Sequence, residues 1–308
     1  MDGRQHTRAG RTAAAVGIMG LTVGLAVGST GCSGSGAAAE GVNGNGSDPV
    51  VILRRAADTL LGAGSSKAGT SMEMATGGTR VTIRGKGVYD YRRRLGRLTV
   101  VLPEDPTGVS EHRPITELLA PGALFMKNRG AGVPADKWVR VETASVSDGN
   151  LVTGGATDPY AAAEILRGTR TAAYLGRSEV GGVRVRHYRG TADLARAARG
   201  ASADNRAPLA AAAKGFATAE VPFDAYLDDQ GRIRKLRQRF SFVNSRQAAA
   251  VAVASTTLLY DFGTPVDVRL PSPGDIYAGR IAENEGEGGS VAEGGSAEAG
   301  SGEIEPPH

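Results

Sequence analysis

Cysteine is nearly absent from this chain of 308 residues, in which Cys32 is the single example. One cysteine excludes an internal disulfide framework, and it also excludes a zinc site built on paired cysteines. Aromatic residues are scarce as well, at 5% of the chain with one Trp. The core must therefore be built mostly from Val, Leu, Ile and Ala, and its packing must supply the stability.

Catalytic patterns are missing too. Of the four histidines, His112 lies in a polar loop and His187 in the middle of a predicted strand, where a lone histidine is usually structural. The Gly-x-Ser-x-Gly pattern of a nucleophile elbow does not occur, and no Gly-rich phosphate loop follows a strand. Asp228-Asp229, followed by Gln-Gly between two strands, is typical of a turn rather than of a cation site. We predict a protein that is not an enzyme and has no cofactor and no metal.

The N-terminal region, up to Cys32, has the order of parts found in a signal sequence. A basic stretch with Arg4, Arg8 and Arg11 precedes an apolar run of small residues, and Ser29-Thr30-Gly31 leads into the cysteine. This order is typical of a secretory signal peptide. A cysteine directly after the small residues indicates a lipoprotein signal over residues 1–31, with Cys32 acylated after cleavage. Ordinary secretion and a retained anchor helix stay open as alternatives.

Composition divides the rest of the chain. Residues 32–48 are rich in Gly and Ser and predict a tether, while residues 49–279 form the folded domain. Residues 280–308 are an acidic Gly/Glu/Ser tail that we expect to be disordered. Without the signal and the seven glutamates of the tail, residues 32–280 carry 33 basic and 24 acidic residues, a net charge of +9. Such a body would be drawn to an anionic membrane surface, unless the arginines are only a solvated strand face.

Two helices are predicted because an Asp-Pro pair, which caps and begins a helix, precedes each. Asp48-Pro49 begins an amphipathic helix over 49–62, and Asp158-Pro159 begins a helix over Tyr160–Arg167. The Ala-rich residues 194–218 predict one or two short helices in a long surface crossover.

Period-two alternation predicts nine to eleven strands in meander order. Gly77-Gly78, Pro121-Gly122 and Gly181-Gly182 are turn signals between them. Because regular helices do not separate the strands, the pattern disfavours a doubly wound parallel sheet. We predict an α+β fold, a strongly curved antiparallel sheet, or unclosed β-barrel, with helices packed across its concave face. The expected strands are 72–76, 81–89, 98–102, 115–119, 124–127, 137–142, 172–180, 183–191, 221–227, 233–243 and 250–262.

The concave face is either a filled core or a cavity. Gly85 and Gly87 place no bulk on it and large aromatic side chains are few, which is compatible with an apolar pocket for acyl chains. A solid core, with the helices closed down on the sheet, remains the alternative. By alternation, the candidate lining residues are Val81, Ile83, Val100, Leu236 and Phe240.

The order of these parts resembles the LppX/LprG/LprF family of actinobacterial lipoproteins, which are similar in fold to the LolA and LolB carriers. The resemblance covers residues 49–275. It implies a half-barrel that holds lipid or lipoglycan acyl chains and carries them across the cell envelope without catalysis. The matching segments are the Cys32 signal, the helix 49–62, Lys137–Val141, Asp158-Pro159, Val180–Tyr188, Val221–Asp228 with Gly231–Leu236, and Tyr260–Gly263.

Three functions therefore remain in view. The first is a lipid-anchored carrier on the outer face of the cell membrane, with a lipid or lipoglycan ligand. The second is an envelope scaffold or sensor with a solid core and a protein partner. The third is a hydrolase, which the missing nucleophile–base set disfavours. Nothing in the chain predicts nucleic-acid binding.

Overall fold

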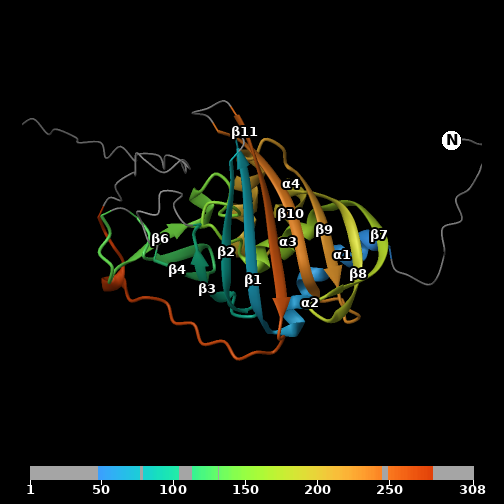
Figure 1. Ribbon diagram of the computed structural model, residues 1–308, viewed down its shortest axis with the longest axis horizontal. Helices are drawn as coiled ribbons and strands as arrows, with labels where there is room; N and C mark the ends of the chain where they lie inside the picture. The colour runs from blue at the N-terminus through green and yellow to red at the C-terminus, as the bar shows by residue number, and fades with distance from the viewer. Residues whose placement is uncertain (1–47, 77–78, 104–112, 131, 245–248, 280–308) are drawn as a thin grey trace, which may run out of the picture. The chain divides into compact units, whose positions relative to one another are not determined.

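One antiparallel sheet of eleven strands dominates the computed structural model, which describes residues 48–76, 79–103, 113–130, 132–244 and 249–279 (Figure 1). The strand order is β6-β5-β4-β3-β2-β1-β11-β10-β9-β8-β7, and the edge strands β6 and β7 do not pair with each other. The predicted unclosed antiparallel sheet is thus confirmed. The strands are β1 Ser65–Thr76, β2 Thr79–Asp90, β3 Leu95–Val101, β4 Ile115–Ala120, β5 Ala123–Lys127, β6 Trp138–Glu142, β7 Thr169–Val180, β8 Val183–Asp193, β9 Glu220–Leu227, β10 Ile233–Asn244 and β11 Ala249–Tyr260.

The chain enters this sheet at its middle and leaves it there. Strands β2 to β6 run outward from β1 to one edge, and the chain then crosses to the other edge at β7. Strands β8 to β11 return inward until β11 pairs with β1, with Met72 opposite Ser255. Short hairpins make the meander, and Gly181 and Gly182 both adopt the positive φ that a type I′ turn between β7 and β8 requires.

Within the described ranges five helices accompany the sheet, and both predicted caps are confirmed. The Asp48 side chain accepts a hydrogen bond from Val50 N at 2.9 Å, and Asp158 accepts from Tyr160 N at 2.7 Å. Of the helices in the described residues, none combines the length and the apolar character needed to cross a membrane. The helices are α1 Pro49–Arg54, α2 Ala56–Ala63, α3 Pro159–Ile165, α4 Leu194–Gly200 and α5 Ala203–Gly215, with short 3-10 turns at Thr143–Ser145, Leu166–Gly168 and Pro273–Asp275.

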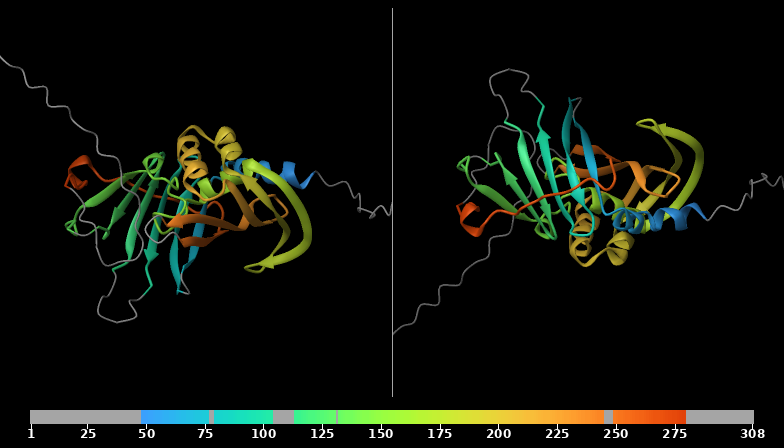
Figure 2. Two further views of the ribbon diagram at one scale, coloured as in Figure 1. Left: turned by 90° about the horizontal axis from the view of Figure 1, so that it is seen from above. Right: turned by 90° about the horizontal axis from the view of Figure 1, so that it is seen from below.

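The Ala-rich segment corrects one expectation. It forms two helices, α4 and α5, as one of the readings predicted, but it is not a surface crossover. It joins β8 to its direct neighbour β9, and it buries Leu194, Ala197 and Leu209 in the main core. Figure 2 shows both helices on one side of the sheet. Small alanine side chains let them approach the segments beneath them closely.

The side of the sheet toward α3 carries the main core, and we call it the inner face. Gln238 of β10 marks it, because its side-chain Nε2 donates to the carbonyl of Ala162 in α3 at 3.0 Å. The opposite, outer face is polar over most of β2 and β10. At β4 and β5 it carries a smaller apolar cluster with Leu118 and Phe125, on which Val268 of the C-terminal extended segment packs.

Several predictions lie outside the described residues. They are the signal 1–31 with Cys32, the tether apart from Asp48, the Gly77-Gly78 turn, His112 and the acidic tail 280–308.

Candidate functional site

All five predicted lining residues lie on the inner face. Ile83, Val100, Leu236 and Phe240 are buried, and Val81 packs against them while remaining partly exposed. They form two groups within one core, since Val81, Ile83 and Val100 come from β2 and β3, whereas Leu236 and Phe240 come from β10. Strands β1 and β11 separate the groups and place Met72 and Ser255 between them.

The segment that joins β6 to β7 covers the first group. We call residues 146–168, which include α3, the cover. A Cβ at Gly155 of the cover would lie 3.5 Å from Ile83 Cγ2 and 3.7 Å from Val100 Cγ1, so its backbone rests on these side chains. A Cβ at Gly85 would lie 3.5 Å from Ala156 Cβ and 2.5 Å from Thr70 Oγ1. The space above Gly85 is therefore filled, and the inner face is closed here in the way of a solid core.

An aromatic contact covers the second group. The ring of Phe216, which follows α5, stacks on Phe240 with centroids 5.0 Å apart and planes at 14°. Such offset ring pairs add roughly 0.5–1.5 kcal/mol beyond their buried area. The β10 half of the inner face is thus held more firmly than the β2–β3 half, where glycine and alanine make the contact.

Three polar ties hold the cover to the sheet. The hydroxyls of Thr157 and Ser255 lie 2.7 Å apart, and Gln238 donates to Ala162. The Tyr89 hydroxyl donates to Asp158 Oδ2 at 3.1 Å. Burial raises the pKa of Asp158, although hydrogen bonds from the α3 backbone and from Tyr89 oppose that rise. The sequence reasoning missed these polar residues because it looked only for apolar side chains at inward positions.

Glu117 is the most unusual group on the inner face. It lies on β4 opposite Leu98 and Met126, it is fully buried, and neither carboxyl oxygen hydrogen-bonds any described residue. Burial raises the pKa of Glu117 to about 8, against the opposing charge of Arg129, so the carboxyl is mostly protonated at neutral pH. Its position between two inward apolar residues could have been read from the strand pattern.

Two further polar atoms on this side are, like the Glu117 oxygens, buried without a described hydrogen-bond partner. Asn150 Oδ1 and Thr70 Oγ1 are buried and hydrogen-bond none of the residues that the structure describes. Asn150 belongs to the cover, where Asn150 Oδ1 lies 3.0 Å and Leu124 Cδ2 lies 3.1 Å from the position of a Cβ on Gly154. An apolar surface with a few polar groups is the composition of sites that bind lipids and other small molecules.

His187 is placed as a structural residue on the outer face. Its Nε2 lies 2.9 Å from Asp224 Oδ1, and its ring stacks on Tyr226 with centroids 4.2 Å apart. It hydrogen-bonds no serine, threonine or cysteine in the described part of the chain. Across the same residues, no group of three or more His, Cys, Asp or Glu side chains is placed to hold a metal ion.

No family model and no curated protein matches the chain. Among solved structures, the lipoprotein LppX of Mycobacterium tuberculosis aligns over 72% of this chain and 100% of its own, with 10% identity and a TM-score of 0.44. LprF of Mycobacterium bovis aligns over 73% and 97%, with 12% identity and a TM-score of 0.35. A LolA superfamily protein of Nitrosomonas europaea aligns over 70% and 95%, with 9% identity and a TM-score of 0.31. LppX and LprF, whose family the sequence resembles, are thus among the solved structures that align with this chain.

Proposed function

We propose that this protein is an extracytoplasmic lipoprotein, anchored to the outer face of the cell membrane through Cys32. It binds lipid or lipoglycan acyl chains between the inner face of its sheet and the cover, and it carries them across the cell envelope without catalysis. The residues that support this proposal are those of the cover and of the inner face beneath it.

The single observation that carries the proposal is the imperfect fit of the cover. Glu117, Asn150 and Thr70 are buried acceptors that hydrogen-bond none of the described residues. Each such group costs about 1–3 kcal/mol, so the closed arrangement is stabilised less than its apolar contacts alone suggest. A lipid that displaces the cover can pair these acceptors with hydroxyl groups of its polar part, while its acyl chain lies on the apolar side chains beside them.

The composition of the cover favours exchange for an acyl chain. Where the cover lies on Ile83 and Val100, it presents Gly155 and Ala156, which bring little apolar area of their own. An acyl chain contributes about 0.8 kcal/mol for each CH₂ group it buries, so a chain of ordinary length can outweigh these small residues and the three polar ties. We expect the β2–β3 half of the inner face to open first.

A disulfide lock on the cover tests this directly. Thr157 and Ser255 are both buried and their hydroxyl oxygens lie 2.7 Å apart, so the variant T157C/S255C places two sulfur atoms within bonding reach across the interface. The mature chain would carry C32S as well, so that only this pair can oxidise. Uptake of a fluorescent fatty acid is measured before and after reduction, and bound lipid is identified by mass spectrometry of an organic extract.

We expect the reduced variant to take up the fatty acid and the oxidised variant to take up little. The same molecule serves as its own control, and T157C alone controls for the loss of the hydrogen bond. Equal uptake in the oxidised and reduced states would refute binding beneath the cover. A folded protein that takes up no lipid in either state, and yields none on extraction, would refute the carrier function itself.

One observation favours the second candidate, a scaffold or sensor that binds a protein. Strand β7 is an edge strand of the described sheet, and its Tyr174 and Leu175 are 48% and 49% exposed. Arg54 of α1 donates to Thr169 at the start of this strand. An exposed apolar edge is suited to pairing with an extended segment of another chain. If this is the function, L175K abolishes co-purification of one partner protein and leaves fatty-acid uptake unchanged.

A further inference from the structure

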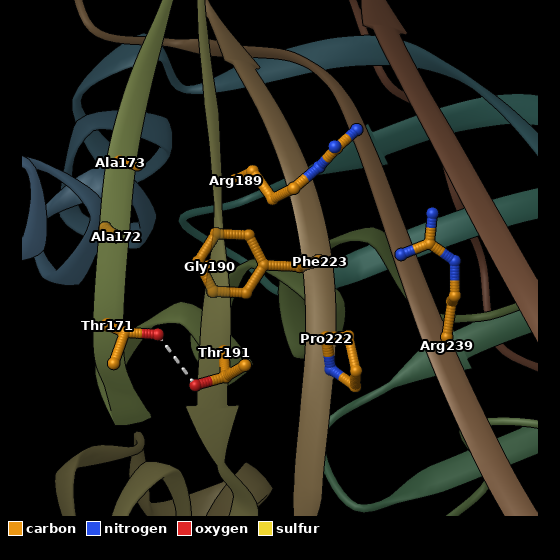
Figure 3. Close-up of a pocket in the computed structure, with 9 residues that line it drawn as sticks. All are labelled: Thr171, Ala172, Ala173, Arg189, Gly190, Thr191, Pro222, Phe223 and Arg239. Atoms are coloured by element: carbon orange, nitrogen blue, oxygen red, sulfur yellow. Dashed lines mark hydrogen bonds between the residues drawn. The ribbon is translucent and has the colours of Figure 1, made fainter.

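A second concave site lies on the outer face, away from the cover. It is a pocket of about 440 Å³ formed where β7, β8, β9 and β10 run side by side (Figure 3). Pro222 gives it an apolar wall, whereas the ring of Phe223 is fully buried in the main core behind it, and the hydroxyls of Thr171 and Thr191 lie 2.9 Å apart at one end. Arg189 and Arg239 stand at the other end.

The sequence creates this hollow through Gly190. A Cβ at Gly190 would lie 2.0 Å from the carbonyl oxygen of Thr171 and 2.9 Å from Phe223 Cζ, so only glycine lets β7 come so close to β8 here. The pairing of β7 with β8 also shifts register between Thr169 and Thr171. Figure 2 shows the β7–β8 hairpin bending away from the rest of the sheet as a broad arc.

Asp224 fixes the two arginines in place. Arg189 Nε donates to Asp224 Oδ1 at 2.9 Å, and Arg239 Nη2 donates to Asp224 Oδ2 at 3.3 Å. Burial would raise the pKa of Asp224, but the hydrogen bonds from His187 and Arg189 and the charges of both arginines outweigh it and lower that pKa. Two positive charges therefore share one negative charge. Their side chains are 61% and 44% exposed, so the remaining N–H groups are accessible to an anion.

The position of this pocket relative to the start of the domain indicates where the anion comes from. Helix α1 packs beside β7, because Arg54 Nη2 donates to the carbonyl of Thr169 at 2.6 Å, two residues before Thr171 of the pocket. Fifteen residues lie between Cys32 and Asp48, so the Cα atoms of these two residues are no more than about 58 Å apart even in a fully extended chain. If Cys32 carries the lipid anchor, the bilayer is held within reach of this face.

We propose that the pocket binds the phosphate group of an anionic membrane lipid between Arg189 and Arg239, and so docks the domain on the bilayer to which it is tethered. The glycerol portion of the lipid lies against Pro222, which is exposed on this face. This docking is separate from acyl-chain binding beneath the cover, since the two sites lie on opposite faces of the sheet.

The test measures partition of the mature chain, with C32S to remove the anchor, onto phosphatidylglycerol and phosphatidylcholine vesicles at physiological salt. The variant R189Q/R239Q removes the proposed contacts. The matched control, R84Q/R97Q, removes the same charge from exposed positions of β2 and β3 on the same face. A third variant, R189K/R239K, keeps the charge but loses the planar fork that suits a phosphate.

We expect binding to phosphatidylglycerol and not to phosphatidylcholine. Since each basic residue at an anionic surface is worth about fivefold in partition, R189Q/R239Q should lower it by about 30-fold and the control pair by less than about threefold. R189K/R239K should fall between the wild type and R189Q/R239Q. Equal losses for the two glutamine pairs would mean diffuse attraction to the whole basic face and would overturn the proposal.

Two other results also test whether the pocket docks the domain on a bilayer. Saturable binding of inorganic phosphate, lost in R189Q/R239Q but without any binding to vesicles, would assign the pocket to a soluble phosphate and overturn the docking. Unchanged fatty-acid uptake in R189Q/R239Q, together with lost vesicle binding, would support two separate sites. Circular dichroism of each variant establishes that the sheet is intact.

Discussion

Replacing Glu117 with glutamine should stabilise the protein, and more so as the pH rises. Glu117 is fully buried on the inner face, with no described hydrogen-bond partner for either oxygen. Glutamine keeps the shape of the side chain and removes the ionisable proton. Because the substitution changes the protonation chemistry and little else, the difference in unfolding free energy between the two proteins isolates the cost of burying this carboxyl.

The magnitude follows from the pKa. In the folded protein burial raises the pKa of Glu117 to about 8, from an ordinary value of 4.5. The folded state keeps the proton over the interval in which the unfolded chain releases it, so wild-type stability falls as the pH rises from about 4.5 to about 8. At 1.36 kcal/mol for each pKa unit, the carboxyl costs about 3 kcal/mol at pH 7 and about 5 kcal/mol above pH 8. Below the ordinary pKa this pH-dependent part of the cost vanishes.

Urea unfolding followed by circular dichroism, at pH values of about 5, 6.5 and 8, measures this difference. We expect the E117Q and wild-type curves to lie close together at the lowest pH and to separate steadily above it. The control is E179Q, at an exposed position of β7, which should show no such separation. Wild-type and E117Q stabilities that run parallel across the whole range would refute a buried, protonated Glu117.

Further predictions concern the pocket backbone and the anchor. G190A should destabilise the protein by about 3 kcal/mol or more in thermal unfolding, because its Cβ would lie 2.0 Å from the Thr171 carbonyl oxygen. The matched substitution G62A, in α2 where a Cβ meets nothing within 4 Å, should instead stabilise by about 1 kcal/mol, and a similar loss in both would contradict the steric argument. C32S should abolish incorporation of radiolabelled palmitate and move the protein from the membrane fraction into the medium, and a labelled C32S protein would rule out lipidation at this residue.

Local chemistry explains what the sequence predicted well. The caps at Asp48 and Asp158 depend on residues two or three positions away, and the type I′ turn depends on Gly181 and Gly182 themselves. Strand alternation also requires only neighbours along the chain. For these reasons the helices, the hairpins and the inward direction of Ile83, Val100, Leu236 and Phe240 could be read without a structure. The predicted meander order holds only within β1–β6 and within β7–β11, because the chain crosses from one edge to the other between β6 and β7 and β1 pairs with β11.

Contacts between distant segments decided the rest. Whether the inner face is open depends on how Gly155 and Ala156 meet β2 and β3, some 55 to 72 residues away in the chain, and no local pattern encodes that contact. The same holds for the meeting of Arg189 and Arg239 on Asp224, which requires β8, β9 and β10 to pair in one register. The period-two alternation along each strand predicted which side chains point inward. Only the packing of the whole sheet decided what lies on top of them, because burial is a property of all the segments that meet at a site.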